Sequence, residues 1–532
     1  MKKPAMTLSS FCGLLPLGLA FFLWALFRFG LSDQSASAHF ELGNWRNKAD
    51  AWVWQKAQEG RVEFLLFLRE QADLSGAKTL SSKTEKGWYV YRRLTEVAER
   101  TQAPLLEQLR QRGVRYRSFW VANMVWVRGG LDDVIALAQR KEVARIVANP
   151  VVQLEIPRAA EDLSLQSADG VEWNLRQVNA DAVWQLAYFG QGVVIGGQDT
   201  GYDWQHPALK NAYRGWDGSQ AKHDYHWHDA IHEPIAPYMA GEGLGAGADS
   251  CPYNSPYPCD DNGHGTHTMG TMVGLEGSNQ IGMAPQAKWI GCRNMDRGRG
   301  TPATYAECFQ WFIAPTKIDG SDPDPSMAPD VINNSWSCPE YEGCSDPNVL
   351  KSVVEAVRAA GILTVQSAGN EGPNCATIRN PGGIYAASFT VGATNSADII
   401  ADFSSRGPVT VDGSNRQKPD VVAPGVGIRS SYPGSRYVSL SGTSMAAPHV
   451  VGLAALVLSV RPYLKGQVDF LEEILRSSAM PLTSSETCGE VLGSQIPNNT
   501  YGWGRIDAWR AVQIALTYPL YVNYFPLVSS GR

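Results

Sequence analysis

The chain has 532 residues, of which 44% are hydrophobic and 18% are charged, and its net charge is −6. A globular chain of this length is too long for one compact core, so about two to four domains are expected. The acidic balance does not fit the basic surface of a nucleic-acid-binding protein, and we therefore expect no nucleic-acid partner.

The N-terminus has the pattern of an export signal. Lys2 and Lys3 precede an apolar run over residues 11–27, and residues 36–38 (Ala-Ser-Ala) fit a small-residue cleavage site. We predict that residues 1–38 are a signal peptide, with an uncleaved membrane anchor as the alternative. Both readings predict a secreted or extracellular protein, which contacts the membrane only if this segment is retained.

Residues 39–158 have the pattern of a small α+β domain, in which strand-like runs accompany two helical patterns. The strands are expected over residues 62–68 and 121–127, and the helices over residues 89–112 and 131–140, the second of which ends before the run at residues 143–147. A mostly polar linker over residues 159–170 is expected to follow this domain.

From residue 171 onward, short apolar runs alternate with helical patterns. Strands are expected over residues 193–195, 289–292, 331–336, 362–367, 389–393 and 421–423, and helices over residues 266–275, 349–360 and 445–460. Nearly continuous apolar strands separated by helices predict an α/β fold, a doubly wound parallel sheet with helices on both faces. We expect this domain to span residues 171–516, followed by a C-terminal tail over residues 517–532.

The cysteines indicate disulfide bonds. Of the nine cysteines, eight lie after residue 250, and an even number in an exported domain favours disulfides over buried free thiols. Cys251 and Cys259 are close enough in sequence to close a short loop, and so are Cys338 and Cys344. The other pairings stay open.

Three segments carry residues suited to nucleophilic catalysis. Asp199 ends an apolar strand in GQDTG, His264 opens a helix in NGHGTH, and Ser444 opens a buried helix in SGTSMAAPH. A serine hydroxyl becomes a nucleophile when a histidine takes its proton, and a buried carboxylate orients that histidine. Each residue alone has an ordinary alternative role as a cap or turn residue. Together, in the order Asp, His, Ser, they predict a catalytic triad whose chemistry requires no cofactor.

These segments resemble the catalytic motifs of the subtilisin-like serine proteases (subtilases). The likeness covers roughly residues 171–515, and GTSMAAPH at residues 442–449 is its most specific part. The resemblance implies a serine-type endopeptidase in which Asp199, His264 and Ser444 form the triad.

Two further motifs resemble binding segments of the same family. SAGNEG at residues 367–372 implies that the Asn370 side chain and the Ser444 N–H stabilise the tetrahedral intermediate. NNSWS at residues 333–337 implies a strand that pairs with an extended protein or peptide substrate. The residues expected to border the pocket are Ser335, Trp336, Ser337, Ala368 and Gly369.

The resemblance also implies a role for the N-terminal α+β domain. It would be an inhibitory propeptide, removed by self-cleavage near residues 156–170, so the chain's own propeptide is an expected partner. An independent binding domain is the alternative.

Gln198 departs from the family pattern, which has an aliphatic residue before the catalytic aspartate. A buried amide needs a hydrogen-bond partner, and the sequence does not indicate one.

Metal binding is a second hypothesis for two groups of residues. Imidazoles suit zinc, copper or nickel, but the spacings of one histidine-rich segment fit no standard site, and we expect no metal there. That segment contains His223, Asp224, His226, His228, Asp229 and His232. Carboxylates that suit structural calcium occur at Asp260, Asp322 and Asp324, but nothing in the sequence selects a site.

Two alternatives to peptide hydrolysis stay open. A catalytically silent binding protein is expected to lose a triad residue or Asn370, and all four are present. A peptide ligase would use the same acyl-enzyme, and a product assay with an added amine acceptor distinguishes it from a hydrolase.

Overall fold

The computed structural model describes residues 45–154, 170–235 and 250–517. The described residues from Arg46 onward belong to one compact unit. The predicted signal segment, nearly all of the predicted linker and all but the first residue of the predicted tail lie outside the described residues.

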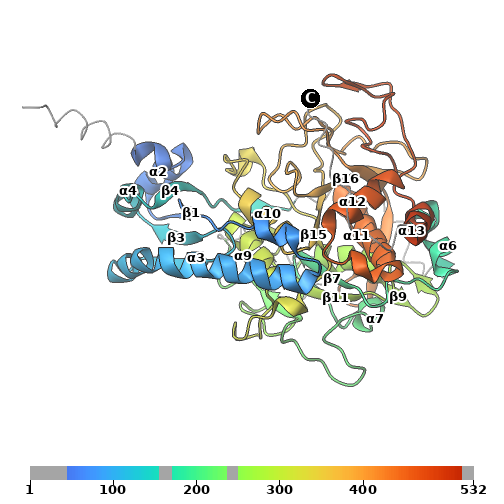
Figure 1. The fold of residues 1–532 in the computed structure, drawn as a ribbon, viewed down its shortest axis with the longest axis horizontal. Coiled ribbons are helices and arrows are strands. Elements are labelled where there is room, and N and C mark those ends of the chain that lie inside the picture. Colours follow the sequence, from blue (N-terminus) through green and yellow to red (C-terminus); the bar gives the residue numbers. More distant parts are fainter. Residues whose placement is uncertain (1–44, 155–169, 236–249, 518–532) are drawn as a thin grey trace, which may run out of the picture. The chain divides into compact units, whose positions relative to one another are not determined.

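A parallel sheet of seven strands forms the centre of the molecule (Figure 1). This sheet, with helices on both faces, confirms the predicted α/β fold. Its strand order is β17 (Val421–Pro424), β16 (Phe389–Thr394), β15 (Leu363–Ser367), β14 (Val331–Asn334), β7 (Val194–Asp199), β11 (Lys288–Arg293) and β8 (Trp227–Asp229).

Both faces of the sheet are buried. On β14, Val331 belongs to one apolar cluster and Ile332 to a second, because successive side chains point to opposite faces. The first cluster includes residues of the helices α8 (His264–Val273), α11 (Thr443–Val460), α12 (Val468–Ser477) and α13 (Ala508–Thr517). The second cluster contains α9 (Pro302–Ile313) and α10 (Lys351–Ala359).

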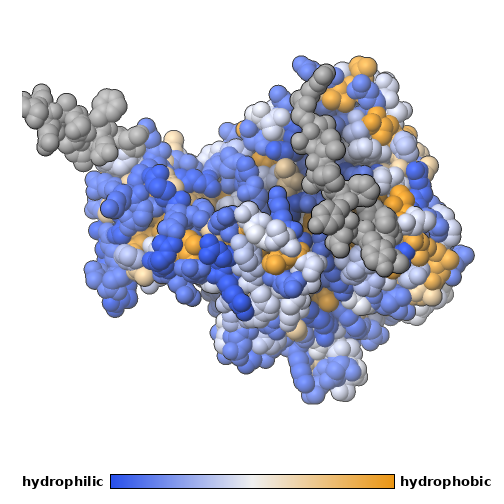
Figure 2. All heavy atoms as spheres, in the orientation of Figure 1, coloured by the Kyte–Doolittle hydropathy of each residue, from blue (hydrophilic) through white to orange (hydrophobic). Residues whose placement is uncertain are grey.

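Helix α11 is the central helix that the sequence predicts. Among the described residues, it is the one helix long and apolar enough to cross a membrane, but 94% of it is buried inside the protein. Its apolar residues therefore belong to the core, and the surface drawn in Figure 2 is mainly hydrophilic with small, separate apolar patches.

The N-terminal α+β region, residues 45–154, contains a four-stranded antiparallel sheet. Its strand order is β2 (Arg115–Phe119), β3 (Met124–Gly129), β1 (Val62–Leu68) and β4 (Val143–Ala148), and its helices are α2 (Ala51–Glu59), α3 (Lys83–Gln111) and α4 (Leu131–Ala138). The prediction of a strand over residues 121–127 is wrong for residues 121–123, since β3 begins at Met124. Residues 120–123 form the turn between β2 and β3, where Asn123 has a φ of 43°, a left-handed conformation that asparagine tolerates.

The N-terminal region packs against α9 and α10, where β2 contacts α9 and α3 contacts α10 (Figure 1). The backbone N–H groups of Trp120 and Val121 donate to Oε1 of Gln310, at 2.7 and 3.2 Å. The Lys83 ammonium lies 2.5 Å from the Asp330 carboxylate. Apolar side chains from both parts belong to one cluster.

The N-terminal region ends in a short strand, β5 (Val152–Gln153), which leaves the α+β sheet. It pairs antiparallel with β13 (Arg299–Gly300), which in turn pairs with β12 (Met295–Asp296). This last described segment before residue 155 thus joins a small sheet of the C-terminal part.

Candidate active site

The carboxyl ends of the central strands bring the predicted site residues to one edge of the sheet. β7 ends at Asp199, β14 is followed directly by Ser335, and β15 ends at Ser367, three residues before Asn370. β7 lies between β11 and β14. After β7 the chain forms β8 and β11 on one side of it and then crosses to β14 on the other side. Such a reversal of strand order opens a crevice at the carboxyl edge, where ligands of α/β proteins bind.

Asp199 and His264 form a buried pair in this crevice. His264 Nδ1 lies 2.8 and 3.0 Å from the two oxygens of Asp199, and the side chains are 2% and 0% exposed. The Thr200 N–H also donates to Asp199, at 2.7 Å. With Nδ1 bound to the carboxylate, Nε2 is the nitrogen available to act as a base.

Ser444 is the second residue of α11, and it is tied to the segment that follows β14. Its hydroxyl donates to the Ser335 carbonyl at 3.4 Å, and the Ser335 hydroxyl donates to the Ser444 carbonyl at 3.0 Å. Pro448 has no N–H for that carbonyl, so Ser335 provides the missing donor. Among the described residues, no hydrogen bond joins Ser444 to His264; catalytic hydrogen bonds often form only when substrate binds.

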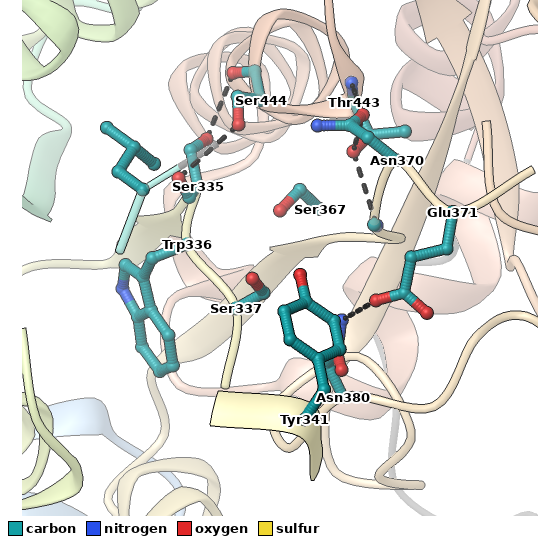
Figure 3. A pocket seen from close by; sticks show the side chains of 12 residues that line it. Ser335, Trp336, Ser337, Tyr341, Ser367, Asn370, Glu371, Asn380, Thr443 and Ser444 are labelled. Atoms are coloured by element: carbon teal, nitrogen blue, oxygen red, sulfur yellow. Dashed lines mark hydrogen bonds between the residues drawn. The ribbon is translucent and has the colours of Figure 1, made fainter. Parts of the chain in front are cut away.

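A pocket opens beside Ser444 (Figure 3). Four of the five predicted pocket residues line it: Ser335, Trp336, Ser337 and Gly369. The fifth, Ala368, is 3% exposed and packs in the apolar cluster instead. The other lining residues are Leu154, Tyr341, Ser367, Asn370, Glu371, Asn380, Thr443 and Ser444.

Sequence reasoning missed Tyr341, Glu371 and Asn380. Their side chains reach the pocket from loops, where no periodicity marks the residues that face a site. Asn380 donates to the Glu371 carboxylate at 2.7 Å, which fixes both side chains at the pocket wall. Only the position of Glu371 inside the SAGNEG motif could have pointed to one of them.

The Asn370 side chain is held in one orientation. Its Oδ1 accepts hydrogen bonds from the Thr443 N–H at 2.9 Å and from the Thr443 hydroxyl at 3.0 Å. The amide nitrogen consequently faces the side of the pocket where Ser444 lies (Figure 3). An N–H donor there is suited to stabilise negative charge that develops beside Ser444.

Gln198 has the partners that its burial requires. Its Nε2 donates to Asn334 at 2.5 Å, and its Oε1 accepts from Asn294 at 3.1 Å. Asn334 also donates to the Val365 carbonyl, at 2.9 Å. This amide network links β7, β14 and β15 directly behind Asp199.

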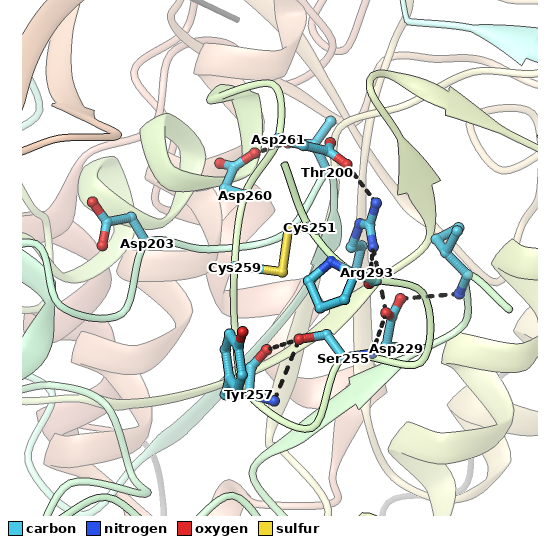
Figure 4. Close-up of a disulfide and its surroundings, with 12 residues drawn as sticks. Thr200, Asp203, Asp229, Cys251, Ser255, Tyr257, Cys259, Asp260, Asp261 and Arg293 are labelled. Atoms are coloured by element: carbon cyan, nitrogen blue, oxygen red, sulfur yellow. Dashed lines mark hydrogen bonds and ion pairs between the residues drawn. A yellow bond between two sulfur atoms is a disulfide. The ribbon is translucent and has the colours of Figure 1, made fainter. Parts of the chain in front are cut away.

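The four disulfides confirm the prediction from the cysteine count and include both predicted short loops. The bonds are Cys251–Cys259, Cys292–Cys308, Cys338–Cys344 and Cys375–Cys488. Cys251–Cys259 closes the loop before Asp260 (Figure 4). Asp260 then accepts hydrogen bonds from Thr200 and from the backbone of Gly263 and Thr266, which anchors the start of α8 beside Asp199.

The histidine-rich segment forms protein contacts. His228 and His232 both bind Oε1 of the buried Glu307, at 3.0 and 2.7 Å. His223 contacts Tyr213, and His226 contacts Arg214. In the described ranges, no group of three or more histidine, cysteine or acidic side chains is arranged to hold a metal ion.

The other acidic residues considered for calcium, Asp322 and Asp324, lie in the one segment that follows α9, and both make protein contacts. Asp322 pairs with Lys317, and Asp324 accepts a hydrogen bond from the Ser326 N–H at 2.8 Å.

The pair formed by His232 and Glu307 makes stability depend on pH. Burial lowers the pKa of His232, but the hydrogen bond and the charge of Glu307 outweigh burial and raise the pKa above its usual value. The pair therefore stabilises the folded protein fully below the pKa of about 6.5 that His232 has in the unfolded chain. This stabilisation is lost as the pH rises through the higher pKa of His232 in the folded protein. We expect His232→Asn to have a lower free energy of unfolding than wild type, as measured with urea. The difference between the two proteins should be larger at pH 5.5 than at pH 8.5.

His223→Asn is the matched control for this prediction. Burial lowers the pKa of His223, so its contribution should change with pH in the opposite direction. Equal pH trends for the two variants would contradict the assignment.

The fold and the site define the class of protein. The subtilase family model (peptidase family S8) matches residues 190–504, which include Asp199, His264, Asn370 and Ser444. The chain belongs to the subtilase family.

Individual relatives agree with this assignment. Bacillopeptidase F of Bacillus subtilis is 38% identical over 461 residues, which cover 82% of this chain and 29% of the relative. Subtilisin of Bacillus pumilus is 32% identical, covering 61% of this chain and 97% of the relative. Serine protease AprX of Bacillus subtilis is 35% identical, covering 48% of this chain and 59% of the relative.

Three segments of this chain resemble bacillopeptidase F, in agreement with this match. They are residues 171–174 (VEWN), 206–209 (HPAL) and 213–215 (YRG). This chain spans less than a third of that relative and less than two thirds of AprX.

Proposed function

We propose that the chain is a secreted serine endopeptidase that hydrolyses peptide bonds through Asp199, His264 and Ser444. The observation that carries the proposal is the buried Asp199–His264 pair at the same sheet edge as Ser444, which opens α11 beside a pocket. The disulfides fit an exported protein. The family match supports the peptidase class.

The catalytic steps follow from the placement of these groups. Ser444 Oγ attacks the carbonyl carbon of the substrate while His264 Nε2 takes the hydroxyl proton, and Asp199 stabilises the resulting imidazolium. The Asn370 amide and the Ser444 N–H donate to the oxyanion. His264 then protonates the leaving amine, and the same groups activate water to hydrolyse the acyl-enzyme.

Substrate recognition would occur through backbone pairing. The backbone beside Ser335, Trp336 and Ser337 borders the pocket, and an extended peptide can lie along such an edge. The proposed substrates are protein segments in extended conformation.

The chain would be made as a self-processing precursor. Residues 1–38 would be the export signal, residues 39–158 the inhibitory propeptide and residues 171–516 the peptidase domain. Support comes from β5, whose pairing with β13 leads Leu154 to the pocket that contains Ser444. A segment bound there blocks access of other substrates.

The experiment compares intact mass and N-terminal sequence for wild type and Ser444→Ala. We expect wild type to lose its N-terminal segment by cleavage between residues 156 and 170, whereas Ser444→Ala stays whole at that position. The purified variant mixed with a trace of wild type should then be cut at the same bond. Equal processing of both chains when expressed separately would reject self-processing.

Asn370→Asp tests the oxyanion donor. Aspartate keeps the oxygen that accepts from Thr443 and removes the N–H donors, so structure is retained while transition-state stabilisation is lost. We expect kcat to fall by about 10²–10³ with little change in KM. Asn374→Asp, the same chemical change at a nearby exposed residue, should keep kcat within about twofold. A normal kcat for Asn370→Asp would contradict the role of Asn370.

A further inference from the structure

A loop closed by a disulfide follows the predicted substrate strand directly. Cys338 comes one residue after Ser337 and is bonded to Cys344. The loop contains the short 3₁₀ helix η4 (Glu340–Glu342) and places Tyr341 at the pocket wall (Figure 3). The proposed mechanism gives this loop no role.

Three consecutive residues of the chain that approaches Ser444 meet this loop. Val152 is 1% exposed and forms an apolar cluster with the two bonded cysteines. The Gln153 N–H donates to Oε1 of Glu342 at 3.0 Å. Leu154 lines the same pocket as Tyr341.

The loop also fits closely against Pro150, which lies two residues before Val152. A Cβ added at Gly343 would lie 3.0 Å from Cβ of Pro150, and Gly343 has a φ of 107°. The loop therefore has a backbone conformation that suits glycine and a shape that follows the strand.

Segment 152–154 shows how an extended chain lies in the groove. Val152 and Gln153 pair antiparallel with β13, and the Leu154 N–H donates to the Gly298 carbonyl at 2.7 Å. At Leu154 the segment reaches the pocket that contains Ser444. Any extended chain that replaces it would meet the same disulfide and the same carboxylate, an argument that rests on the proposed peptidase function.

We propose that the Cys338–Cys344 loop is a specificity-determining wall of the substrate groove. It selects an aliphatic side chain at the position of Val152, because that side chain is buried against the apolar disulfide and a charged side chain would be buried there without a partner. Glu342 binds the backbone N–H of the next residue, whatever its side chain. The disulfide keeps this wall in place before substrate binds, which lowers the ordering cost of binding.

The test uses matured enzyme and two peptides that span residues 148–172 of this chain, which include every bond where self-cleavage is expected. One peptide has the natural Val152 and the other has aspartate in its place. We expect wild type to cleave the valine peptide with a kcat/KM about 10–200-fold higher. In Cys338→Ala/Cys344→Ala this ratio should fall below about threefold, because the wall is no longer fixed.

Glu342 provides an independent test that does not depend on the disulfide variant folding. Glu342→Ala should raise KM for both peptides about five- to tenfold with kcat nearly unchanged, since one charge-assisted hydrogen bond is lost. Glu342→Gln keeps an acceptor oxygen and should restore most of the affinity. Glu340→Ala, on the exposed side of the same loop, is the control and should match wild type.

The inference is overturned if Cys338→Ala/Cys344→Ala is active and keeps the wild-type preference for the valine peptide. It is also overturned if Glu342→Ala leaves KM unchanged. If wild type cleaves neither peptide nor any unfolded protein, the proposed peptidase function itself fails, and this outcome differs from a loss of selectivity.

Discussion

Ser444→Ala is expected to hydrolyse added peptides at least about 10⁴-fold more slowly than wild type, because no other group replaces the attacking oxygen. The residual rate should come from the oxyanion donors and from substrate positioning. The measurement is kcat on a fluorogenic peptide. Before the assay, a trace of tagged wild type cleaves the N-terminal segment from the Ser444→Ala chain, which frees the variant's substrate-binding cleft. The tagged wild type is then removed.

The control for this experiment is Ser459→Ala. Ser459 lies near the other end of α11, where its hydroxyl bonds to the Leu456 carbonyl at 2.7 Å, so its loss removes a helical serine hydroxyl without touching the site. It should retain kcat within about twofold. A freed Ser444→Ala chain with more than a hundredth of wild-type kcat would show that another group is the nucleophile.

Arg293→Met should cost about 3–5 kcal/mol of folding free energy. Arg293 is fully buried at the end of β11, 3.3 Å from Asp229, 3.2 Å from Asp296 and bonded to Asp261 (Figure 4). Burial lowers the pKa of Arg293, but these carboxylates outweigh burial and raise it. Removing the cation leaves buried carboxylates without their charge partner.

The loss of folding free energy in Arg293→Met should depend on pH. Burial raises the pKa of Asp261 to about 7 even with Arg293 present. Without the cation, the pKa of Asp261 should rise further above its unfolded value, so the variant loses stability as pH increases. Urea unfolding in the Ser444→Ala background, which prevents autolysis, should show a larger deficit at pH 8 than at pH 5.5.

The control for Arg293 is Lys317→Met, which breaks an exposed ion pair with Asp322 and should leave the unfolding midpoint nearly unchanged. A deficit for Arg293→Met as small as that of Lys317→Met would show that the buried carboxylates do not need the cation. Arg293 pairs in register with Asp199, and Asp261 lies three residues before His264, so folding of the site and of this cluster should be linked.

The sequence predicted those parts of the fold that local patterns specify. Asp199, His264 and Ser444 each stand at the end of a strand or at the start of a helix, and parallel strands bring such positions to one edge. Helix α9 was missed because its residues are buried on nearly all sides. The N-terminal region covers its outer face, so its sequence has no polar stripe and therefore no helical periodicity to detect.

The contacts that complete the site could not be predicted, because they join distant segments. Gln198 is satisfied by Asn294, which directly follows β11, and by Asn334, the last residue of β14. Glu342 reaches Gln153 across a separation of 189 residues. Such contacts depend on strand order and loop course, which a single sequence does not specify.

The most direct test of the central claim is labelling of the matured enzyme with a fluorophosphonate, a reagent that reacts with activated serine hydroxyls. We expect one equivalent to attach, peptide mapping to place it on Ser444, and His264→Ala to abolish the reaction because the base is gone. A label on another residue, or equal labelling of the His264→Ala chain, would contradict the assignment of Ser444 as a nucleophile activated by His264.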